Sequence, residues 1–184
     1  MRAFIAITLP EEVKESLAGL SSRLQTSRAK ATWVRPERMH LTLRFLGDVS
    51  ERQVEQLIAR LAPAYEGRAP FELAVAGVGV FPNVRKPSVV WAGITPLEGG
   101  LAQTQHIAEE AATGIGLPPE TRPFHPHLTL ARIRHPHRLG TLAEWLAREA
   151  KFSGHAFVVS AVSLFSSELT RKGPIYQQLG EFRF

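Results

Sequence analysis

The chain of 184 residues contains no cysteine. Disulfide bonds, thiolate metal ligands and a cysteine nucleophile are therefore excluded. Long apolar runs are absent as well. The first apolar stretch, residues 3–7, is too short for the core of a signal peptide. No segment approaches the roughly 18 apolar residues that span a bilayer, and we expect a cytoplasmic protein.

The sequence also lacks low-complexity segments, Gly/Ser-rich linkers and blocks of like charge, so no boundary between independent domains is visible. Hydrophobic residues make up 44% of the chain, which is enough for one core in a protein of this length. We expect residues 1–184 to form a single domain.

Positive charge exceeds negative charge, with 22 Lys and Arg against 17 Asp and Glu and a formal net charge of +5. A positive field concentrates phosphates near the surface, so this balance favours a polyanionic partner. Most of the basic residues are arginine, whose planar fork suits phosphate. Many basic proteins bind no nucleic acid, and charge alone does not decide the point.

Four helices are predicted by capping motifs, and the first two of these motifs are followed by apolar residues at helical spacing. The capping motifs begin at Thr8, Ser50, Thr95 and Thr141. The apolar stripes comprise Val13, Leu17, Leu20 and Leu24 in the first helix and Val54, Leu57, Ile58 and Leu61 in the second. Pro63 should end the second helix, and the third should reach about Gly114 or Gly116.

Strand-like segments alternate with these helices. They are Arg2–Thr8, Ala31–Val34, Met39–Leu46, Phe71–Val80, Ser88–Ile94, His127–Ile133, His155–Leu164 and Ile175–Phe184. The pattern predicts an α+β or α/β fold with substantial sheet.

One four-residue motif occurs twice: His40-Leu41-Thr42-Leu43 returns as His127-Leu128-Thr129-Leu130. A capping motif and a helix follow each copy, which indicates duplication of a strand-loop-helix unit. Residues two apart in a strand share a face, so each histidine points the same way as its threonine while the leucines anchor the strand. Two lobes related by a pseudo-twofold axis would bring the polar pairs together across a groove.

Paired histidines suit cleavage of a strained cyclic phosphodiester, in which one group takes a proton from water and another gives a proton to the departing ribose oxygen. An ordinary histidine pKa of ~6.5 keeps both protonation states populated near neutrality. Thr42 and Thr129 can donate hydrogen bonds to the non-bridging oxygens, and Arg132 can offset the charge. Since a diester has a single negative charge and the ring is strained, we expect no metal and no cofactor.

The segments around both motifs resemble the 2H phosphoesterase superfamily, specifically the LigT-like family of 2'-5' RNA ligases and RNA 2',3'-cyclic phosphodiesterases. The resemblance covers nearly the whole chain. Besides the two H-x-T-x motifs, it rests on Arg2–Ile7, Trp33–Pro36, His40–Gly47, Phe81–Asn83, Val90–Gly93, Pro123–Arg132 and Ser167–Leu169.

This resemblance implies a bilobal α+β fold, in which the antiparallel sheets of two pseudo-symmetric lobes face a central cleft. It implies hydrolysis of RNA 2',3'-cyclic phosphate ends, such as those of tRNA fragments, to 2'-phosphate ends. His40 would protonate the leaving O3' and His127 would activate water. The phosphate ligands would be Thr42, Thr129 and Arg132. Family members are also credited with joining RNA ends through a 2'-5' linkage without ATP, with a ribose hydroxyl replacing water at the same site.

Several alternatives stay open. Phe45 either stacks on the terminal base or packs in the core, and His125 either supports the site or lies in a loop. The pair His135 and His137 favours a solvated turn over a metal site. An RNA-binding module without turnover would keep the same groove, and a related enzyme would act on a small cyclic phosphate such as ADP-ribose 1'',2''-cyclic phosphate. Pseudo-symmetry alone permits either order of acid and base, and a complete two-lobe site predicts a monomer.

Overall fold

The computed structural model describes residues 1–96, 99–171 and 173–184. The helices are α1 (Glu11–Gln25), α2 (Glu51–Tyr65), α3 (Gly100–Thr113), α4 (Leu142–Arg148) and the 3-10 helix η1 (Pro36–Arg38). The strands are β1 (Arg2–Thr8), β2 (Ala31–Trp33), β3 (His40–Asp48), β4 (Phe71–Phe81), β5 (Val89–Thr95), β6 (His127–Ile133), β7 (Ser153–Val159), β8 (Ala161–Thr170) and β9 (Gly173–Arg183). Among the described residues, none of the helices has the length and apolar character that a membrane span requires.

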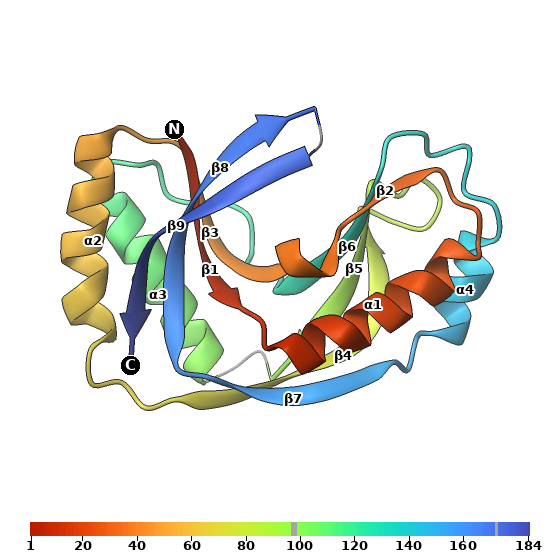
Figure 1. Ribbon diagram of the computed structural model, residues 1–184, viewed down its shortest axis with the longest axis horizontal. Coiled ribbons are helices and arrows are strands. Elements are labelled where there is room, and N and C mark those ends of the chain that lie inside the picture. The colour runs from red at the N-terminus through yellow and green to blue at the C-terminus, as the bar shows by residue number, and fades with distance from the viewer. Residues whose placement is uncertain (97–98, 172) are drawn as a thin grey trace.

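The strands form two antiparallel sheets (Figure 1). Sheet A has the strand order β3-β1-β8-β9, and sheet B has the order β2-β6-β5-β4-β7. Helices α2 and α3 lie together on one side of the molecule, while α1 and α4 lie together on the other. The α+β fold with two antiparallel sheets that the resemblance implies is confirmed.

The two lobes exchange both strands and helices. Strand β4 comes after β3 and α2 of the sheet A lobe, yet it pairs with β5 and β7 in sheet B. In return, β8 follows β7 of sheet B and pairs with β1 in sheet A. Helix α1 leaves β1 and packs against β7 and α4, whereas α3 leaves β5 and packs against β3 and α2. Each lobe therefore contains segments from both halves of the sequence.

The predicted apolar stripe of α1 faces the core, and the side chains of Val13, Leu17, Leu20 and Leu24 are completely buried. Full burial of one such side chain contributes about 1.5–3 kcal/mol, so the stripe is enough to hold the helix against sheet B. Its start differs from the prediction. Helix α1 begins after Pro10, which has no side-chain donor or acceptor, and Thr8 instead ends β1. Thr141 precedes α4 but makes no side-chain cap either.

The start of α2 agrees with the prediction, because Ser50 and Gln53 form a reciprocal capping box. The expectation that Pro63 ends this helix is wrong, since α2 continues to Tyr65. The Tyr65 ring is fully buried and its hydroxyl donates to the carbonyl of Thr104 at 2.8 Å. This tertiary contact holds the last turn in place after the proline.

Helix α3 ends at Thr113 and is followed by Gly114, in agreement with the predicted end. It begins at Gly100, later than the capping motif at Thr95 indicated, and residues 97 and 98 of that motif lie outside the described residues.

The single strand predicted over His155–Leu164 is wrong, since the chain forms β7 and β8 there. The strands separate at Ser160, where the chain passes from sheet B to sheet A. Its carbonyl accepts a hydrogen bond from the backbone N–H of Phe184 at 2.9 Å. No glycine or proline marks this transfer, so local sequence patterns do not reveal it.

Candidate active site

The two H-x-T-x motifs open β3 and β6, and these two strands contact each other where the sheets meet. The first seven residues of both strands have the same pattern of burial. In each, the histidine and threonine are half-buried on one face and the two leucines are buried on the other. The alternation predicted for the motifs is thus confirmed, and the two strand starts are structural equivalents.

A bulge follows the motif in β6. Thr129 pairs with Trp91 and Ala131 pairs with Val90, so β6 has one extra residue between two pairs that are consecutive in β5. Such a bulge reverses the alternation beyond it. Arg132, which would otherwise lie on the leucine face, is therefore exposed on the face of the histidine and threonine.

Strand β3 has the same bulge at the same point. Thr42 pairs with Ala6 and Arg44 pairs with Ile5 of β1, which again leaves one extra residue in the motif strand. Phe45 is thereby placed on the His40 face, with 56% of its surface exposed. Packing of Phe45 in the core is excluded by this exposure. Phe45 and Arg132 thus occupy corresponding positions in the two lobes.

Each histidine ring is held by a backbone carbonyl two residues before it. His40 Nδ1 lies 2.9 Å from the carbonyl oxygen of Arg38, and His127 Nδ1 lies 2.7 Å from that of His125. A carbonyl oxygen only accepts, so Nδ1 must carry the proton in both rings and Nε2 is the nitrogen that exchanges protons. His125 therefore supports the site through its backbone, which any residue type could supply.

Aromatic rings surround His40. Its ring stacks on Phe4 with centroids 4.6 Å apart and meets Tyr176 edge-on at 5.3 Å, while Phe165 in turn stacks on Phe4 at 5.4 Å. Burial among these rings lowers the pKa of His40 to about 4. The hydrogen bond to Arg38 opposes this shift, and the positive charge of Arg132 adds to it.

His127 is less enclosed. Phe81 meets its ring edge-on at 5.0 Å. Burial again lowers the histidine pKa, the bond to the His125 carbonyl opposes the shift, and the charges of Arg132 and His125 reinforce it. In the protein without substrate, both histidines are therefore weaker bases than an ordinary histidine side chain in water.

Arg132 is close enough to act on both histidines, and also on the hydroxyl of Tyr176. Neither threonine hydroxyl of the motifs, Thr42 or Thr129, has a hydrogen-bond partner within the part of the chain that the structure describes. The structure thus brings one cation and two histidines together, beside two hydroxyl groups available to a ligand.

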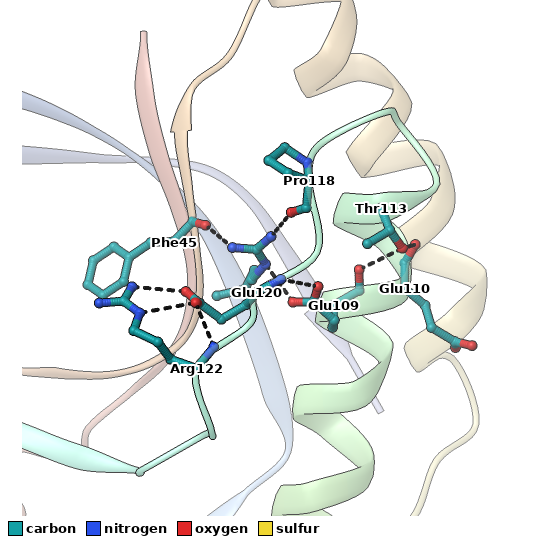
Figure 2. Close-up of polar contacts among 8 residues, drawn as sticks. Phe45, Glu109, Glu110, Thr113, Pro118, Glu120 and Arg122 are labelled. Atoms are coloured by element: carbon teal, nitrogen blue, oxygen red, sulfur yellow. Dashed lines mark hydrogen bonds and ion pairs between the residues drawn. The ribbon is translucent and has the colours of Figure 1, made fainter.

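Arg44, next to Phe45, points the other way and is buried. Its Nε lies 2.6 Å from a carboxylate oxygen of Glu109 in α3. Its other nitrogens donate to the carbonyls of Phe45, at 2.8 Å, and Pro118, at 2.5 Å (Figure 2). Glu109 also accepts from the backbone N–H of Glu120 at 2.9 Å. These contacts fasten the loop that leads to His127 onto the strand that carries His40.

Sequence reasoning missed the side chains that reach the site from other strands. Sheet A brings Phe4 of β1 and Tyr176 of β9 against His40, and Phe165 of β8 stacks on Phe4. The buried pair of Arg44 and Glu109 was missed as well. Phe4 lies in a strand whose central residues are uniformly apolar and buried, so no alternation singles it out, and the positions of Phe165 and Tyr176 depend on the strand exchange.

The chain matches the family model described as LigT like Phosphoesterase over residues 7–91 and 94–176. A curated RNA 2',3'-cyclic phosphodiesterase of Methanothermobacter thermautotrophicus is 35% identical, and the match covers 100% of this chain and 98% of that protein. Another, from Aeropyrum pernix, is 36% identical over 91% of this chain and 94% of its own length.

Solved structures agree. A crystal structure of a protein from Thermus thermophilus has a TM-score of 0.83 at 29% identity and covers 100% of this chain and 97% of its own. E. coli LigT complexed with 3'-AMP has a TM-score of 0.79 at 26% identity, with the same coverage.

Proposed function

This chain belongs to the LigT-like phosphoesterase family, and we propose that it hydrolyses RNA 2',3'-cyclic phosphate ends to 2'-phosphate ends. The observation that carries the proposal is the matched setting of His40 and His127. Each ring is fixed through Nδ1 by a carbonyl, and the charge of Arg132 reaches both. The names of the curated relatives support the reaction and the class of substrate.

In the proposed reaction, His127 Nε2 takes a proton from water as the water oxygen bonds to phosphorus. The bond between phosphorus and O3' breaks, and protonated His40 Nε2 gives its proton to O3'. Arg132 offsets the phosphate charge, while the hydroxyls of Thr42 and Thr129 donate to the non-bridging oxygens. The products are a 2'-phosphate and a free 3'-hydroxyl, and the proton that His127 gains balances the one that His40 loses.

Substrate binding has to change the protonation of His40. With a pKa of about 4 this ring is neutral near pH 7 in the free protein. An anionic phosphate stabilises the imidazolium form and also pairs with Arg132, whose charge otherwise opposes protonation. His127 has a lowered pKa and stays unprotonated near neutrality, as a general base must. The order of acid and base is part of the proposal.

The remaining parts of the proposal follow from the same site. A ribose 5'-hydroxyl of a second RNA strand in place of water would attack the same cyclic phosphate, break the same bond to O3' and join RNA ends through a 2'-5' linkage without ATP. The two-histidine chemistry requires no metal. Since one chain supplies every proposed group, we propose a single-domain monomer, acting in the cytoplasm.

The test is incubation of the protein, in excess EDTA, with an RNA oligomer that ends in a 2',3'-cyclic phosphate. We expect conversion to a 2'-phosphate end and a loss of roughly 10²–10⁴-fold in rate for both His40→Ala and His127→Ala. His155→Ala, an exposed histidine of β7, is the matched control and should retain activity.

Each alternative gives a different result in this experiment. A binding module would leave the RNA end unchanged while binding it in a salt-dependent way. An enzyme for small cyclic phosphates would hydrolyse ADP-ribose 1'',2''-cyclic phosphate but not the oligomer. Activity that EDTA abolishes would contradict the metal-free mechanism.

A further inference from the structure

Arg38 is a half-buried arginine two residues before His40, which begins β3. It ends η1, and its backbone carbonyl accepts the bond from His40 Nδ1. Its guanidinium lies against the first residue of β9, where a Cβ built on Gly173 would come within 2.5 Å of Arg38 Nη1. Gly173 has a φ of +105°, so glycine suits both the backbone and this close approach.

The Arg38 charge has no counter-ion in the part of the chain that the structure describes. Among residues 1–96, 99–171 and 173–184, no carboxylate lies within ion-pairing distance of Arg38, and no acceptor bonds to its side chain. Arg44, by contrast, has Glu109 as its partner. Withdrawing an unpaired charge from water is costly, and an anionic ligand is the usual means of compensation. An arginine presents two parallel donors that suit a phosphate.

Arg38 also belongs to the neighbourhood of the proposed site. Its charge and that of Arg132 both act on the Tyr176 hydroxyl, lowering a pKa that burial raises more strongly. Tyr176 in turn meets His40 edge-on. Arg38 and Arg132 are therefore two cations near one tyrosine, of which only Arg132 has a role in the proposed chemistry.

The proposed reaction defines which part of the substrate lies near Arg38. If His40 protonates O3', the terminal ribose lies on the His40 side and water on the His127 side. The strand of RNA continues from that ribose through its 5' oxygen. We propose that Arg38 binds the phosphate on the 5' side of the terminal nucleotide, an inference that rests on the proposed function and deepens it. The site would then distinguish an RNA end from a nucleoside that has only the cyclic phosphate.

Two substrates that differ only in this phosphate test the inference: cytidine 2',3'-cyclic phosphate with and without a 5'-phosphate. We expect the wild type to have a kcat/KM roughly ten- to a hundredfold higher for the 5'-phosphorylated form, as one charge-assisted contact supplies. Arg38→Met, which keeps the length of the side chain without its charge, should bring the ratio close to one. Arg38→Lys should retain part of the ratio. Arg35→Met removes an exposed arginine three positions earlier and should leave the ratio unchanged.

The outcomes separate the inference from the function on which it rests. Failure of the wild type to hydrolyse these two substrates and the RNA oligomer would refute the proposed function. Hydrolysis of both substrates with equal efficiency, or an equal loss on both in Arg38→Met, would overturn the role of Arg38. Turnover of the substrate without the 5'-phosphate also reports whether each variant is folded. The wild-type preference should shrink at high salt, since a partly exposed contact is screened.

Discussion

The motif strands of the two lobes have the same backbone and different neighbours. Both place a histidine, a threonine and, past a bulge, a further residue on one face. That further residue is Phe45 in one lobe and Arg132 in the other, and aromatic rings enclose His40 more fully than His127. Duplication of a backbone thus accounts for two histidines in matched settings, whereas a few side chains outside the repeated motif make the two halves chemically unequal.

The two motif strands also differ at the residue just before Phe45 and Arg132. Arg44 corresponds to Ala131, and both are buried beneath the bulge. Ala131 is paired with Trp33 of the neighbouring strand β2. Arg44 instead reaches α3 and the loop before β6 through Glu109 and Pro118. One lobe therefore carries the contact that sets the position of the other lobe's histidine.

The largest expected effect distinguishes the acid from the base. His40→Ala and His127→Ala should each lose roughly 10²–10⁴-fold in kcat on a normal cyclic phosphate. A substrate with sulfur in place of O3' has a leaving group that departs without a proton. On that substrate His40→Ala should recover most of its rate, measured in single turnover, and His127→Ala should not. Recovery by His127→Ala instead would reverse the assigned order.

The next effect concerns the cation that one lobe alone supplies. Arg132→Met should lower kcat by about 10²-fold or more, since it removes a donor from the developing charge on phosphate. Loss of its positive charge should also raise the pKa of both histidines, because that charge lowers both. The pH profile of kcat/KM should therefore shift to higher pH. Arg134→Met, at an exposed arginine two residues later, should change neither quantity.

The buried ion pair affects stability more than chemistry. Arg44→Met leaves Glu109 without its cation, and we expect unfolding free energy to fall by about 3 kcal/mol, the lower end for a broken buried pair because the Glu109 side chain is 21% exposed. The double variant with Glu109→Gln should recover part of this loss, as measured in urea. Equal stability of the single and double variants would show that the charge pairing itself contributes nothing.

Local patterns predicted the parts of the site that lie within one strand. The alternation of His40 with Thr42, and its repetition at His127, is visible in sequence because a strand has a period of two residues. The bulges are not visible in the sequence. They alone explain why Phe45 and Arg132 lie on the same face as the motif histidines although an odd number of positions separates them. The spacing of residues gives no sign of the ring contacts to Phe4 and Tyr176, which depend on which strands become neighbours.

The fold shows the same division. The stripe of α1 was predictable because burial follows helical spacing, as at Leu17 and Leu20. The helix ends and the break at Ser160 were not, because tertiary contacts decide them. The hydroxyl bond of Tyr65 extends α2 past Pro63, and Ser160 marks a change of sheet within one strand-like segment that has no glycine or proline after Gly154.

The smallest effect tests the aromatic position that corresponds to Arg132. Phe45 is exposed, so Phe45→Ala should leave stability nearly unchanged, while loss of base stacking should raise KM about tenfold. Phe45→Trp should keep the wild-type KM. An abasic ribose 2,3-cyclic phosphate offers no base to stack on, and Phe45→Ala should match the wild type on that substrate. An equal loss on both substrates would instead show that Phe45 supports His40 through Phe4, since the centroids of the Phe45 and Phe4 rings lie 6.3 Å apart. Phe45 and Arg132 would then both act at the phosphate end of the substrate.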